Sequence, residues 1–348
     1  MARKRNITQL KIDAQIFTSC HNLFDMQNKI NISKNDFLMN VLSPKYYNFK
    51  VKKANGSYRK IEAPDNSLKQ IQAKLNYFLQ AVYYFNQTKA SFGFIVTPRN
   101  KKSTKNIVKN AEKHLGCKNM LKVDFKDFFH QIKSNQVYDI YTGKLFSFDK
   151  KTSNYLTKIS IYKNRLPMGS PISPVLSNLY SISLDNTLQD WANNHNVIYT
   201  RFVDDLTFSS KTNQFNKHHF DEINAICLQH QLKLNTHKTK FYTEKDTKSV
   251  TGLILSDTVD IDPNFYKALD KNLQRLKAIT EASILMNKLQ NNDLLKKTKQ
   301  IVYGQINFIG TVEGYNSSIY KEYVHKYTVS KNVVIDKLSE NWIHFSYI

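Results

Sequence analysis

Two adjacent carboxylates interrupt a pair of apolar, β-like runs. They are Asp204 and Asp205, and the runs Val197–Val203 and Leu206–Ser209 flank them. In a continuous strand neighbouring side chains point to opposite faces, whereas at the tight turn of a hairpin both can approach one point. We therefore predict that this Asp pair lies at the tip of a hairpin. For the pair alone, an Asx-type turn without a metal is the competing interpretation.

A further carboxylate lies much earlier in the chain. Asp124 belongs to the β-like run Met120–Phe125, and Phe128 and Phe129 then begin a predicted helix. A single Asp at the end of a strand is most often a helix cap or a turn residue. Mg²⁺, however, takes one or two carboxylates together with substrate phosphates, and two such ions about 4 Å apart clamp both oxygens of a phosphoryl transfer. Carboxylates at the ends of separate strands thus suggest a phosphoryl-transfer site.

A rigid loop is the third element that could take part in the chemistry. Arg165–Pro174 contains three prolines, one glycine and two serines within ten residues, and the run Val175–Leu188 after it is predicted to be a helix. One interpretation is a connecting loop and nothing more. The functional interpretation is a shaped floor for a nucleotide and its template base, because Gly169 lets a backbone come close.

The charge of the chain indicates the kind of partner that these residues serve. Its 348 residues carry 51 Lys and Arg against 28 Asp and Glu, a formal charge of +23. This excess is far more than solubility requires and attracts the phosphates of nucleic acids. An acidic site in so basic a protein is explained if the carboxylates hold metal and the surrounding cations hold strands. The alternative is an unusually basic enzyme of ordinary kind.

Length and cysteine content narrow the class of protein. The length predicts about two domains that share a sizeable core. Cys20, Cys117 and Cys227 show neither pairing nor zinc-type spacing, which indicates a reducing cytoplasm. Met1–Phe17 has no apolar signal region and no run of about 18 apolar residues occurs, so we expect no membrane segment.

Hydrophobic periodicity predicts the elements that must position these residues. An Asn-Gly turn at 55–56 and the apolar face of Leu68–Val82 predict a hairpin followed by an amphipathic helix. Short β-like runs alternate with helical stretches from Met120 to about Asp260, which predicts an α+β layer of a small sheet and helices. Asp262 and Pro263 begin a mostly helical final third. The lysines of that region are either a solvated face or a track for a phosphate backbone.

Together these elements resemble motifs A, B and C of reverse transcriptases, in the order and at the approximate separations of that family. Asp124 with Asp127 and Phe129 looks like motif A. Leu166–Pro174 looks like motif B, and Phe202–Asp205 looks like motif C. Each motif is weak alone, but the ordered set is specific.

Two further patterns are similar to signatures of retron reverse transcriptases. Asn110 and His114 match the NAxxH signature, and Val250, Thr251 and Gly252 match the VTG signature. The resemblance implies that both patterns recognise the enzyme's own RNA. From the residues alone, the first is a local hydrogen-bonded pair on one helical face, and the second begins a β-like run to residue 255.

The resemblance implies a right-hand polymerase architecture, an α+β fold with fingers, a palm that contains a small antiparallel sheet, and a helical thumb. A helical N-terminal extension is expected over residues 1–49. Interleaved fingers and palm follow over residues 50–260, and residues 261–348 form the helical thumb or RNA-binding C-terminal region.

The resemblance also assigns catalytic roles. Asp124, Asp204 and Asp205 are implied to form a carboxylate triad that holds two Mg²⁺ ions, one activating the primer hydroxyl and the other stabilising pyrophosphate. Lys238 matches the motif D lysine, a candidate proton donor to pyrophosphate, although a solvated surface lysine is the alternative.

Several residues are implied to bind the incoming nucleotide. Phe129 stands at the position of the aromatic steric gate that excludes a ribose 2′-OH, and Gly169 belongs to the nucleotide floor. Arg59, in the family pattern Arg-x-Ile-x-x-Pro, is expected to contact triphosphate or template, and Arg99 is a weaker candidate. Met168 replaces the usual Gln, and a thioether cannot donate the hydrogen bonds of an amide.

Other departures lie near the same motifs. Phe202 and Val203 replace the commoner Tyr-Ala, which removes a hydroxyl near the primer end. His130 and Gln131 stand where many retron enzymes carry Pro-Ser, a change for which the sequence offers no physical reason.

The expected function is therefore that of an RNA-directed DNA polymerase of a retron in a bacterial cytoplasm. Such an enzyme reverse transcribes part of its cognate structured noncoding RNA from a 2′-OH primer and leaves branched msDNA, using deoxynucleoside triphosphates. The resemblance further implies antiphage defence with a separate effector protein. The alternatives are another bacterial reverse transcriptase, of the group II intron or abortive-infection type, and a noncatalytic RNA-binding scaffold.

Overall fold

The computed structural model describes residues 5–52, 56–99, 105–286 and 292–332. The chain divides into two compact units, Met1–Lys248 (unit 1) and Ser249–Ile348 (unit 2), and each is considered by itself. Asn55 of the predicted turn and residues 333–348 of the predicted thumb lie outside the described residues. The subdomain boundaries at residues 49 and 260 stay predictions.

Unit 1 begins with three helices and a hairpin. The helices are α1 (Ile7–Thr18), α2 (Leu23–Ile30) and α3 (Lys34–Leu42), each with an Asn or Ser at its N-cap whose side chain accepts a backbone N–H. The antiparallel strands β1 (Tyr46–Lys52) and β2 (Tyr58–Pro64) and the helix α4 (Asn66–Asn86) follow. These elements confirm the predicted N-terminal helices and the hairpin followed by an amphipathic helix.

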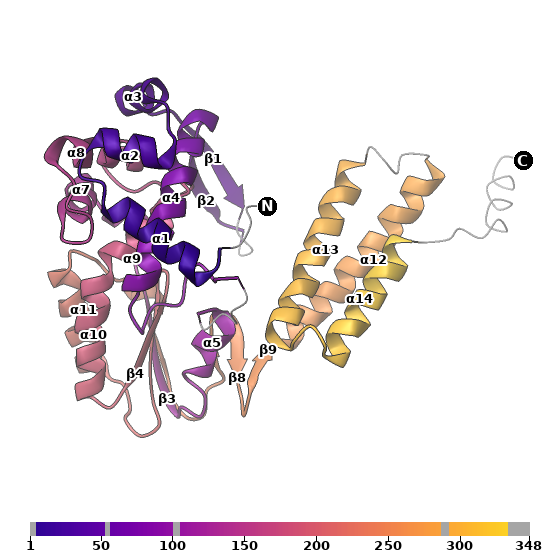
Figure 1. Ribbon diagram of the computed structural model, residues 1–348. Helices are drawn as coiled ribbons and strands as arrows, with labels where there is room; N and C mark the ends of the chain where they lie inside the picture. Colours follow the sequence, from indigo (N-terminus) through magenta and orange to yellow (C-terminus); the bar gives the residue numbers. More distant parts are fainter. Residues whose placement is uncertain (1–4, 53–55, 100–104, 287–291, 333–348) are drawn as a thin grey trace, which may run out of the picture. The chain divides into compact units, whose positions relative to one another are not determined.

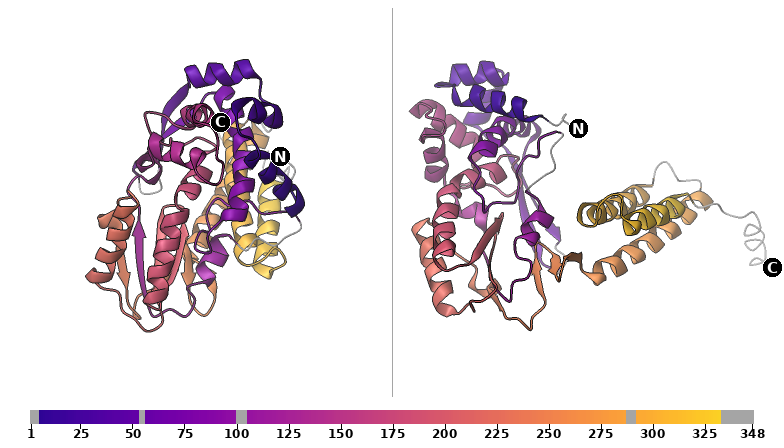
Figure 2. Two further views of the ribbon diagram at one scale, coloured as in Figure 1. Left: turned by 60° about the vertical axis from the view of Figure 1, so that its left-hand side comes forward. Right: turned by 60° about the horizontal axis from the view of Figure 1, so that its bottom comes forward.

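A four-stranded antiparallel sheet, here called the palm sheet, forms the second part of unit 1. Its order is β4-β5-β3-β6, from strands Ile198–Phe202 (β4), Asp205–Ser210 (β5), Asn119–Asp124 (β3) and Lys240–Tyr242 (β6). Figures 1 and 2 show α2 and α3 at one end of unit 1 and the palm sheet at the other. The small sheet predicted from the β-like runs is therefore present.

The remaining helices of unit 1 surround the palm sheet and α4. They are α5 (Ile107–Glu112), α6 (Phe128–Gln131), α7 (Ser134–Thr142), α8 (Lys150–Ser160), α9 (Ser173–Tyr180), α10 (Ile182–Asn194), α11 (Lys217–Gln229) and the 3-10 turn η1 (Thr236–Lys238). The single helix predicted over 175–188 is thus wrong, because Ser181, with φ −81° and ψ 1°, ends α9 and begins α10.

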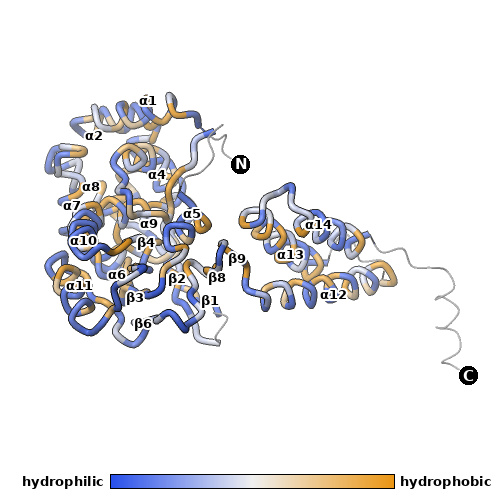
Figure 3. Tube along the Cα trace, turned by 90° about the horizontal axis from the view of Figure 1, so that it is seen from below, coloured by the Kyte–Doolittle hydropathy of each residue, from blue (hydrophilic) through white to orange (hydrophobic). Residues whose placement is uncertain are grey.

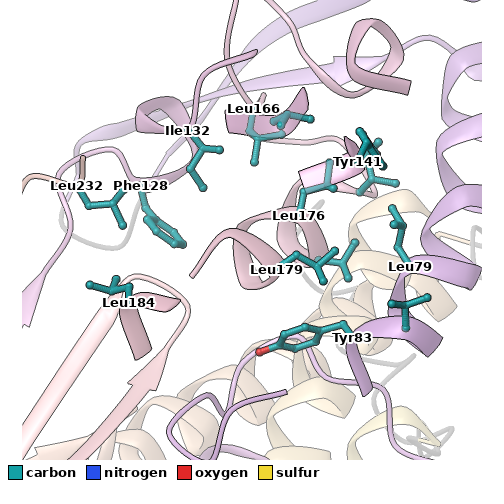
Figure 4. Packing of buried hydrophobic residues seen from close by; sticks show 14 of the residues in the cluster. Leu79, Tyr83, Phe128, Ile132, Tyr141, Leu166, Leu176, Leu179, Leu184 and Leu232 are labelled. Carbon is teal, nitrogen blue, oxygen red and sulfur yellow. The ribbon is translucent and has the colours of Figure 1, made fainter. Parts of the chain in front are cut away.

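One hydrophobic core runs through unit 1. Leu79 and Tyr83 of α4 pack toward Leu176 and Leu179 of α9, and the same cluster continues to Phe128 beside the palm sheet (Figure 4). In Figure 3 the hydrophobic colour gathers on α9 and β4 inside the unit. The elements that carry the candidate site therefore rest on a shared, close-packed base.

Unit 2 contains a small sheet and three long helices. Strands β7 (Lys248–Val250), β8 (Leu253–Leu255) and β9 (Val259–Ile261) are neighbours in that order. The helices are α12 (Pro263–Leu285), α13 (Asp293–Val312) and α14 (Ser318–Lys331). Asp262 caps α12 and Pro263 opens it, as the sequence predicts. None of the helices formed by the described residues is long and apolar enough to cross a membrane.

Candidate active site

The palm sheet brings the three predicted carboxylates together at one end. Asp124, the last residue of β3, lies directly opposite Asp205, the first residue of β5. Val203 and Asp204 form the two-residue turn between β4 and β5, and the Asp204 carbonyl accepts the Phe125 amide at 3.0 Å. The Asp pair is therefore at a hairpin tip, beside a carboxylate about eighty residues away in sequence.

The crowding of these carboxylates changes their acidity. Burial, the hydrogen bond with Asp124 and the charge of Asp204 raise the pKa of Asp205 to about 7. Burial and then the Asp124 charge raise the pKa of Asp204 as well. Carboxylates pushed toward protonation by burial and by one another gain most from a nearby cation. A positive charge close to these carboxylates would therefore stabilise their ionised form.

Lys238 supplies part of that charge. Its Nζ donates to both carboxylate oxygens of Asp124 at 3.0 Å. Burial lowers the pKa of Lys238, but the hydrogen bond to Asp124 and the charges of Asp124, Asp204 and Asp205 raise it overall. The turn η1 holds this lysine in place because the Asn235 amide donates to the Asp124 carbonyl at 2.7 Å. The predicted motif D lysine is therefore in direct contact with Asp124 and interacts electrostatically with Asp204 and Asp205.

The donor set fits a hard divalent cation, although no ready-made cage is present. Within the described ranges, no group of three or more His, Cys, Asp or Glu side chains is already arranged to hold a metal ion. Three carboxylates are nevertheless the oxygen ligands that Mg²⁺ prefers, and substrate phosphates complete such sites. Binding would displace the Lys238 ammonium from Asp124 and relieve the raised pKa values.

A buried ion pair supports the turn that carries Asp204. Arg201 of β4 and Asp185 of α10 are both fully buried, and the guanidinium donates to both carboxylate oxygens at 2.7 and 2.8 Å. Another guanidinium nitrogen donates to the Val203 carbonyl at 3.0 Å. Val203 has φ of 63°, a left-handed conformation that is strained for a β-branched residue. The ion pair therefore stabilises a strained turn at the centre of the site.

Gly93 forms the other wall of this turn. A Cβ at Gly93 would lie 2.7 Å from Cγ2 of Val203, a distance that real side chains do not tolerate. Its carbonyl accepts from Asn178 at 2.9 Å, and Asn178 in turn accepts from Arg201 at 3.2 Å. The absence of a side chain at Gly93 therefore lets this residue pack directly against the turn at Val203.

The Arg165–Pro174 loop lies against β2. Gly169 has φ of 136°, and a Cβ there would lie 2.9 Å from both the Glu62 carbonyl oxygen and Cγ2 of Ile61. The Glu62 amide donates to the Met168 carbonyl at 2.7 Å. The predicted close approach of a backbone is present, and the approaching backbone is that of β2.

The other predicted nucleotide contacts lie in separate surroundings. Phe129 is half-buried on α6 and packs against the core. Arg59 is exposed on β2, and its charge acts to lower the pKa of Asp204, although burial raises that pKa overall. Arg99, in contrast, bonds through its amide to the Arg5 carbonyl. Arg59 therefore interacts electrostatically with the carboxylates.

Asn110 and His114 lie in the interior of unit 1. Both are buried, and the His114 ring bridges Ser209 at 2.6 Å and Thr200 at 2.7 Å, which joins β5 to β4. Burial, and then the Lys122 charge, lowers the pKa of His114 to about 3, so the ring is neutral. A direct contact of these side chains with RNA is not available in this structure. In this structure the His114 ring joins the two strands of the β4–β5 hairpin, and the role of both residues in RNA recognition stays a prediction.

The segment Val250–Gly252 forms a tight turn in unit 2. Thr251 and Gly252 have φ of 51° and 81° and connect β7 to β8, whereas Val250 is buried. Two successive positive φ values are typical of a type I′ turn, in which Gly is favoured. The single β-like run predicted over 250–255 is therefore wrong, because the chain reverses at its second and third residues.

Four functional neighbours escaped the sequence-based prediction. Arg201, Asp185, Glu62 and His130 each make polar contacts within the site or directly behind it. For Arg201 a signal existed, since a charged residue stands within an apolar β run just before the Asp pair. Asp185 and Glu62 carry no such signal, because their partners are distant in sequence.

Comparisons with known proteins agree with this geometry. The family model described as "Reverse transcriptase (RNA-dependent DNA polymerase)" matches residues 51–255. The chain is 29% identical to the Retron Ec86 reverse transcriptase of Escherichia coli over 261 residues, which cover 74% of this chain and 78% of that protein. It is 25% identical to the Retron Ec48 reverse transcriptase of Escherichia coli, over 78% of this chain and 66% of that protein.

Solved structures give a weaker likeness. Telomerase from Candida albicans, in complex with a fragment of telomeric RNA, aligns at a TM-score of 0.44 and 14% identity. The alignment covers 85% of this chain and 62% of that one. This score is too low to indicate a common fold by itself. The right-hand polymerase architecture rests instead on the family match and on the palm sheet with its surrounding helices.

Proposed function

This chain belongs to the reverse transcriptase (RNA-dependent DNA polymerase) family, and from this premise we propose that it synthesises the msDNA of a retron. It copies part of its cognate structured noncoding RNA into DNA, beginning at a 2′-OH of a guanosine in that RNA. Its substrates are deoxynucleoside triphosphates, and its product is a branched RNA–DNA molecule. We place this activity in a bacterial cytoplasm, in antiphage defence, together with a separate effector protein.

The pairing of Asp124 with Asp205 beside Asp204 is the observation that supports this function most strongly. We propose that these three carboxylates hold two Mg²⁺ ions. Bound Mg²⁺ would act as a Lewis acid that activates the primer hydroxyl and neutralises charge on the phosphates. Without carboxylates at this end of the palm sheet, that chemistry would have no ligands.

The chain's own side chains supply the remaining functions. Without metal, Lys238 keeps a proton on Nζ next to Asp124, because the three carboxylates raise its pKa. Displaced from Asp124 when metal binds, the ammonium would donate this proton to departing pyrophosphate. Phe129 excludes a ribose 2′-OH with its ring. Met168 and Gly169 form the floor beneath the base through their backbone, and Arg59 binds the triphosphate.

The β1–β2 hairpin offers a surface for single-stranded template. Large apolar side chains at alternate positions of β1 are 65%, 49% and 47% exposed, and they are Tyr47, Phe49 and Val51. Alternate residues share one face of a strand, and Arg59, directly opposite Val51, lies on this same face. Lys50, Lys52 and Lys60 are exposed on the other face of the hairpin, within reach of the phosphates of a strand that passes along its edge. Aromatic side chains that stack on bases beside cations that hold phosphates are typical of single-strand binding sites.

The retron signatures take different parts in this proposal. His114 supports the hairpin from inside and affects RNA binding only indirectly, together with Asn110. The turn Val250–Gly252 is the element that we assign to recognition of the cognate RNA. The positive φ values of Thr251 and Gly252 place these two residues in the turn and not in the strands on either side.

The test is DNA synthesis on the cognate RNA with Mg²⁺ and deoxynucleoside triphosphates. We expect a branched product from the unaltered chain, none from Asp204→Asn, and normal yield from the exposed control Asp221→Asn. Equal synthesis by Asp204→Asn would refute the metal assignment. Synthesis on any primed RNA but not from the cognate RNA would favour another lineage of reverse transcriptase. Binding without synthesis by the unaltered chain would favour a noncatalytic scaffold.

A further inference from the structure

A buried carboxylate joins three segments around the proposed nucleotide site. Glu62 of β2 is fully buried, and its Oε1 accepts from Arg165 Nη2 at 2.8 Å. Its Oε2 lies 3.2 Å from Nε2 of His130, the third residue of α6 (Phe128–Gln131). Its amide holds the Met168 carbonyl. One residue thus connects β2, the segment after Phe129 and the loop that carries Met168.

The position of the proton on His130 follows from these contacts. Nε2 of His130 and Oε2 of Glu62 face each other at 3.2 Å, and among the described residues neither atom makes a well-aligned hydrogen bond. Burial and then the Arg165 charge lower the pKa of His130, so the ring is neutral near neutral pH. A neutral ring with a bare Nε2 would point its lone pair at the carboxylate. We therefore infer that the proton lies on Nε2, which places an N–H rather than a lone pair toward Glu62.

The same two segments also meet through backbone and apolar contacts. The Leu166 amide donates to the Ile132 carbonyl at 3.0 Å, and both side chains lie side by side in the core (Figure 4). The apolar contact fixes how close the segments come, but it does not fix their rotation. Directional contacts from Arg165 and His130 to one carboxylate add that restraint.

We propose that Glu62, His130 and Arg165 form a positioning cluster that sets the distance between the Phe129 ring and the backbone of Met168 and Gly169. This distance determines which sugar fits and how tightly the incoming nucleotide binds. The role depends on the polymerase function proposed above.

The cluster offers a physical reason for a histidine at position 130. A proline at this position, as in many retron enzymes, has no N–H and no polar side chain to donate toward a carboxylate. His130 directly follows Phe129 on a helix of only four residues, so restraint of one ring is transmitted to the other. Arg165 acts at the opposite side, three residues before Met168, and holds the start of the loop.

The experiment measures single-nucleotide addition to a primer on an RNA template, with deoxynucleoside and ribonucleoside triphosphates. The variants are Glu62→Gln, Arg165→Met, His130→Leu and His130→Gln, and the control is Glu244→Gln, an exposed carboxylate of the same unit. We expect KM for the deoxynucleotide to rise about tenfold in Arg165→Met, with kcat nearly unchanged, because one charged hydrogen-bond donor is removed.

The two His130 variants separate positioning from mere stability. His130→Leu should raise the ratio of ribonucleotide to deoxynucleotide addition about tenfold, comparable to the loss of one good hydrogen bond. Gln can place a donor near the position of Nε2 and should restore most of the selectivity. If both variants keep the selectivity of the unaltered chain, the cluster has no positioning role. A loss of kcat without change of KM or selectivity in Arg165→Met would overturn it equally.

A spectroscopic measurement keeps the inference independent of activity. Nitrogen-15 NMR of the histidine rings should show His130 protonated at Nε2 near neutral pH, and Glu62→Gln should change that signal while Glu244→Gln leaves it. A ring protonated only at Nδ1 would contradict the cluster. If the unaltered chain adds no nucleotide at all, the polymerase function has failed, whereas normal addition with insensitive variants refutes the cluster alone.

Discussion

The two units of the chain differ sharply in charge. Unit 1 contains 39 Lys and Arg against 18 Asp and Glu, an excess of 21, whereas unit 2 contains 12 against 10, an excess of 2. Nearly all of the formal charge of +23 therefore belongs to the unit that carries the carboxylates. The basic residues of the final helices are balanced by acidic ones. A phosphate track along them is thus less favoured than binding by unit 1.

The units also differ in the charged groups that they bury, whereas both expose apolar side chains. Unit 1 buries charged and polar groups close to the site, among them Arg201, Asp185 and His114. Unit 2 exposes large apolar side chains on its helices, namely Leu285, Met286, Leu294, Ile301, Tyr303, Val324 and Val329. Unit 1 exposes large apolar side chains as well, among them Tyr47 and Phe49, so the units differ mainly in charge. We therefore expect unit 1 to supply most of the electrostatic attraction for nucleic acid.

Loss of one carboxylate should give the largest difference between the effect on the polymerisation rate and the effect on RNA affinity. We expect Asp124→Asn to reduce polymerisation about a thousandfold, since metal-stabilised charge in a transition state contributes several kcal/mol. RNA affinity should not fall, because the substitution removes a negative charge from a basic surface. Primer-extension rates and filter binding at constant salt measure both quantities. Parallel losses of activity and affinity would mean that the carboxylates serve the fold of unit 1.

Loss of the buried arginine should destabilise one unit and spare the other. Arg201→Met leaves the Asp185 carboxylate buried without its charged partner, which costs about 3 kcal/mol. We expect hydrogen exchange to accelerate in β4 and β5, with no change in α12–α14. The exposed control Arg59→Met should leave exchange in β4 unchanged. Uniform acceleration across both units would contradict the idea that each unit is stabilised by its own contacts.

Local sequence patterns predicted the helices, strands and turns of both units well, but they did not predict the tertiary contacts between these elements. The Asp204–Asp205 turn, the α12 cap at Asp262 and the face of α4 all follow from residues close together in sequence. The break at Ser181 was missed because α9 and α10 share a continuous apolar pattern. Propensity alone does not locate such a break when tertiary packing decides it.

The proposed metal ligands of the site could be predicted from the sequence, but the polar residues that hold the site in place could not. The carboxylates follow from type and spacing, whereas the Glu62 and Arg165 pair joins residues 103 positions apart. Burial of His114 likewise depends on Thr200 and Ser209, which no local pattern connects to it. Long-range polar contacts leave no periodic signal, so they become visible only in the folded chain.

The salt dependence of RNA binding should distinguish the surfaces of the two units. Replacing Lys50 and Lys60 with Gln should reduce the slope of log K against log salt by about 1.4, which is roughly 0.7 for each phosphate that the variant no longer neutralises. Ile301→Ser and Leu294→Ser should weaken binding by a smaller factor and leave the slope unchanged. Titrations at several salt concentrations test this. A lower slope in the unit 2 variants would show that unit 2 also binds phosphates.

Proton binding by Asp205 should make the stability of unit 1 depend on pH. Its pKa in the folded chain is about 7 against an ordinary 3.8, so the folded state holds this proton more tightly than the unfolded chain does. The resulting stabilisation is complete below pH 3.8 and is lost as the pH rises to about 7. Without metal, the unaltered chain should therefore lose stability over this range relative to Asp205→Asn, and Mg²⁺ should reduce the difference because it binds the carboxylate form. Hydrogen exchange in β3 and β5 measures this, and identical pH profiles for both proteins would show that Asp205 titrates normally.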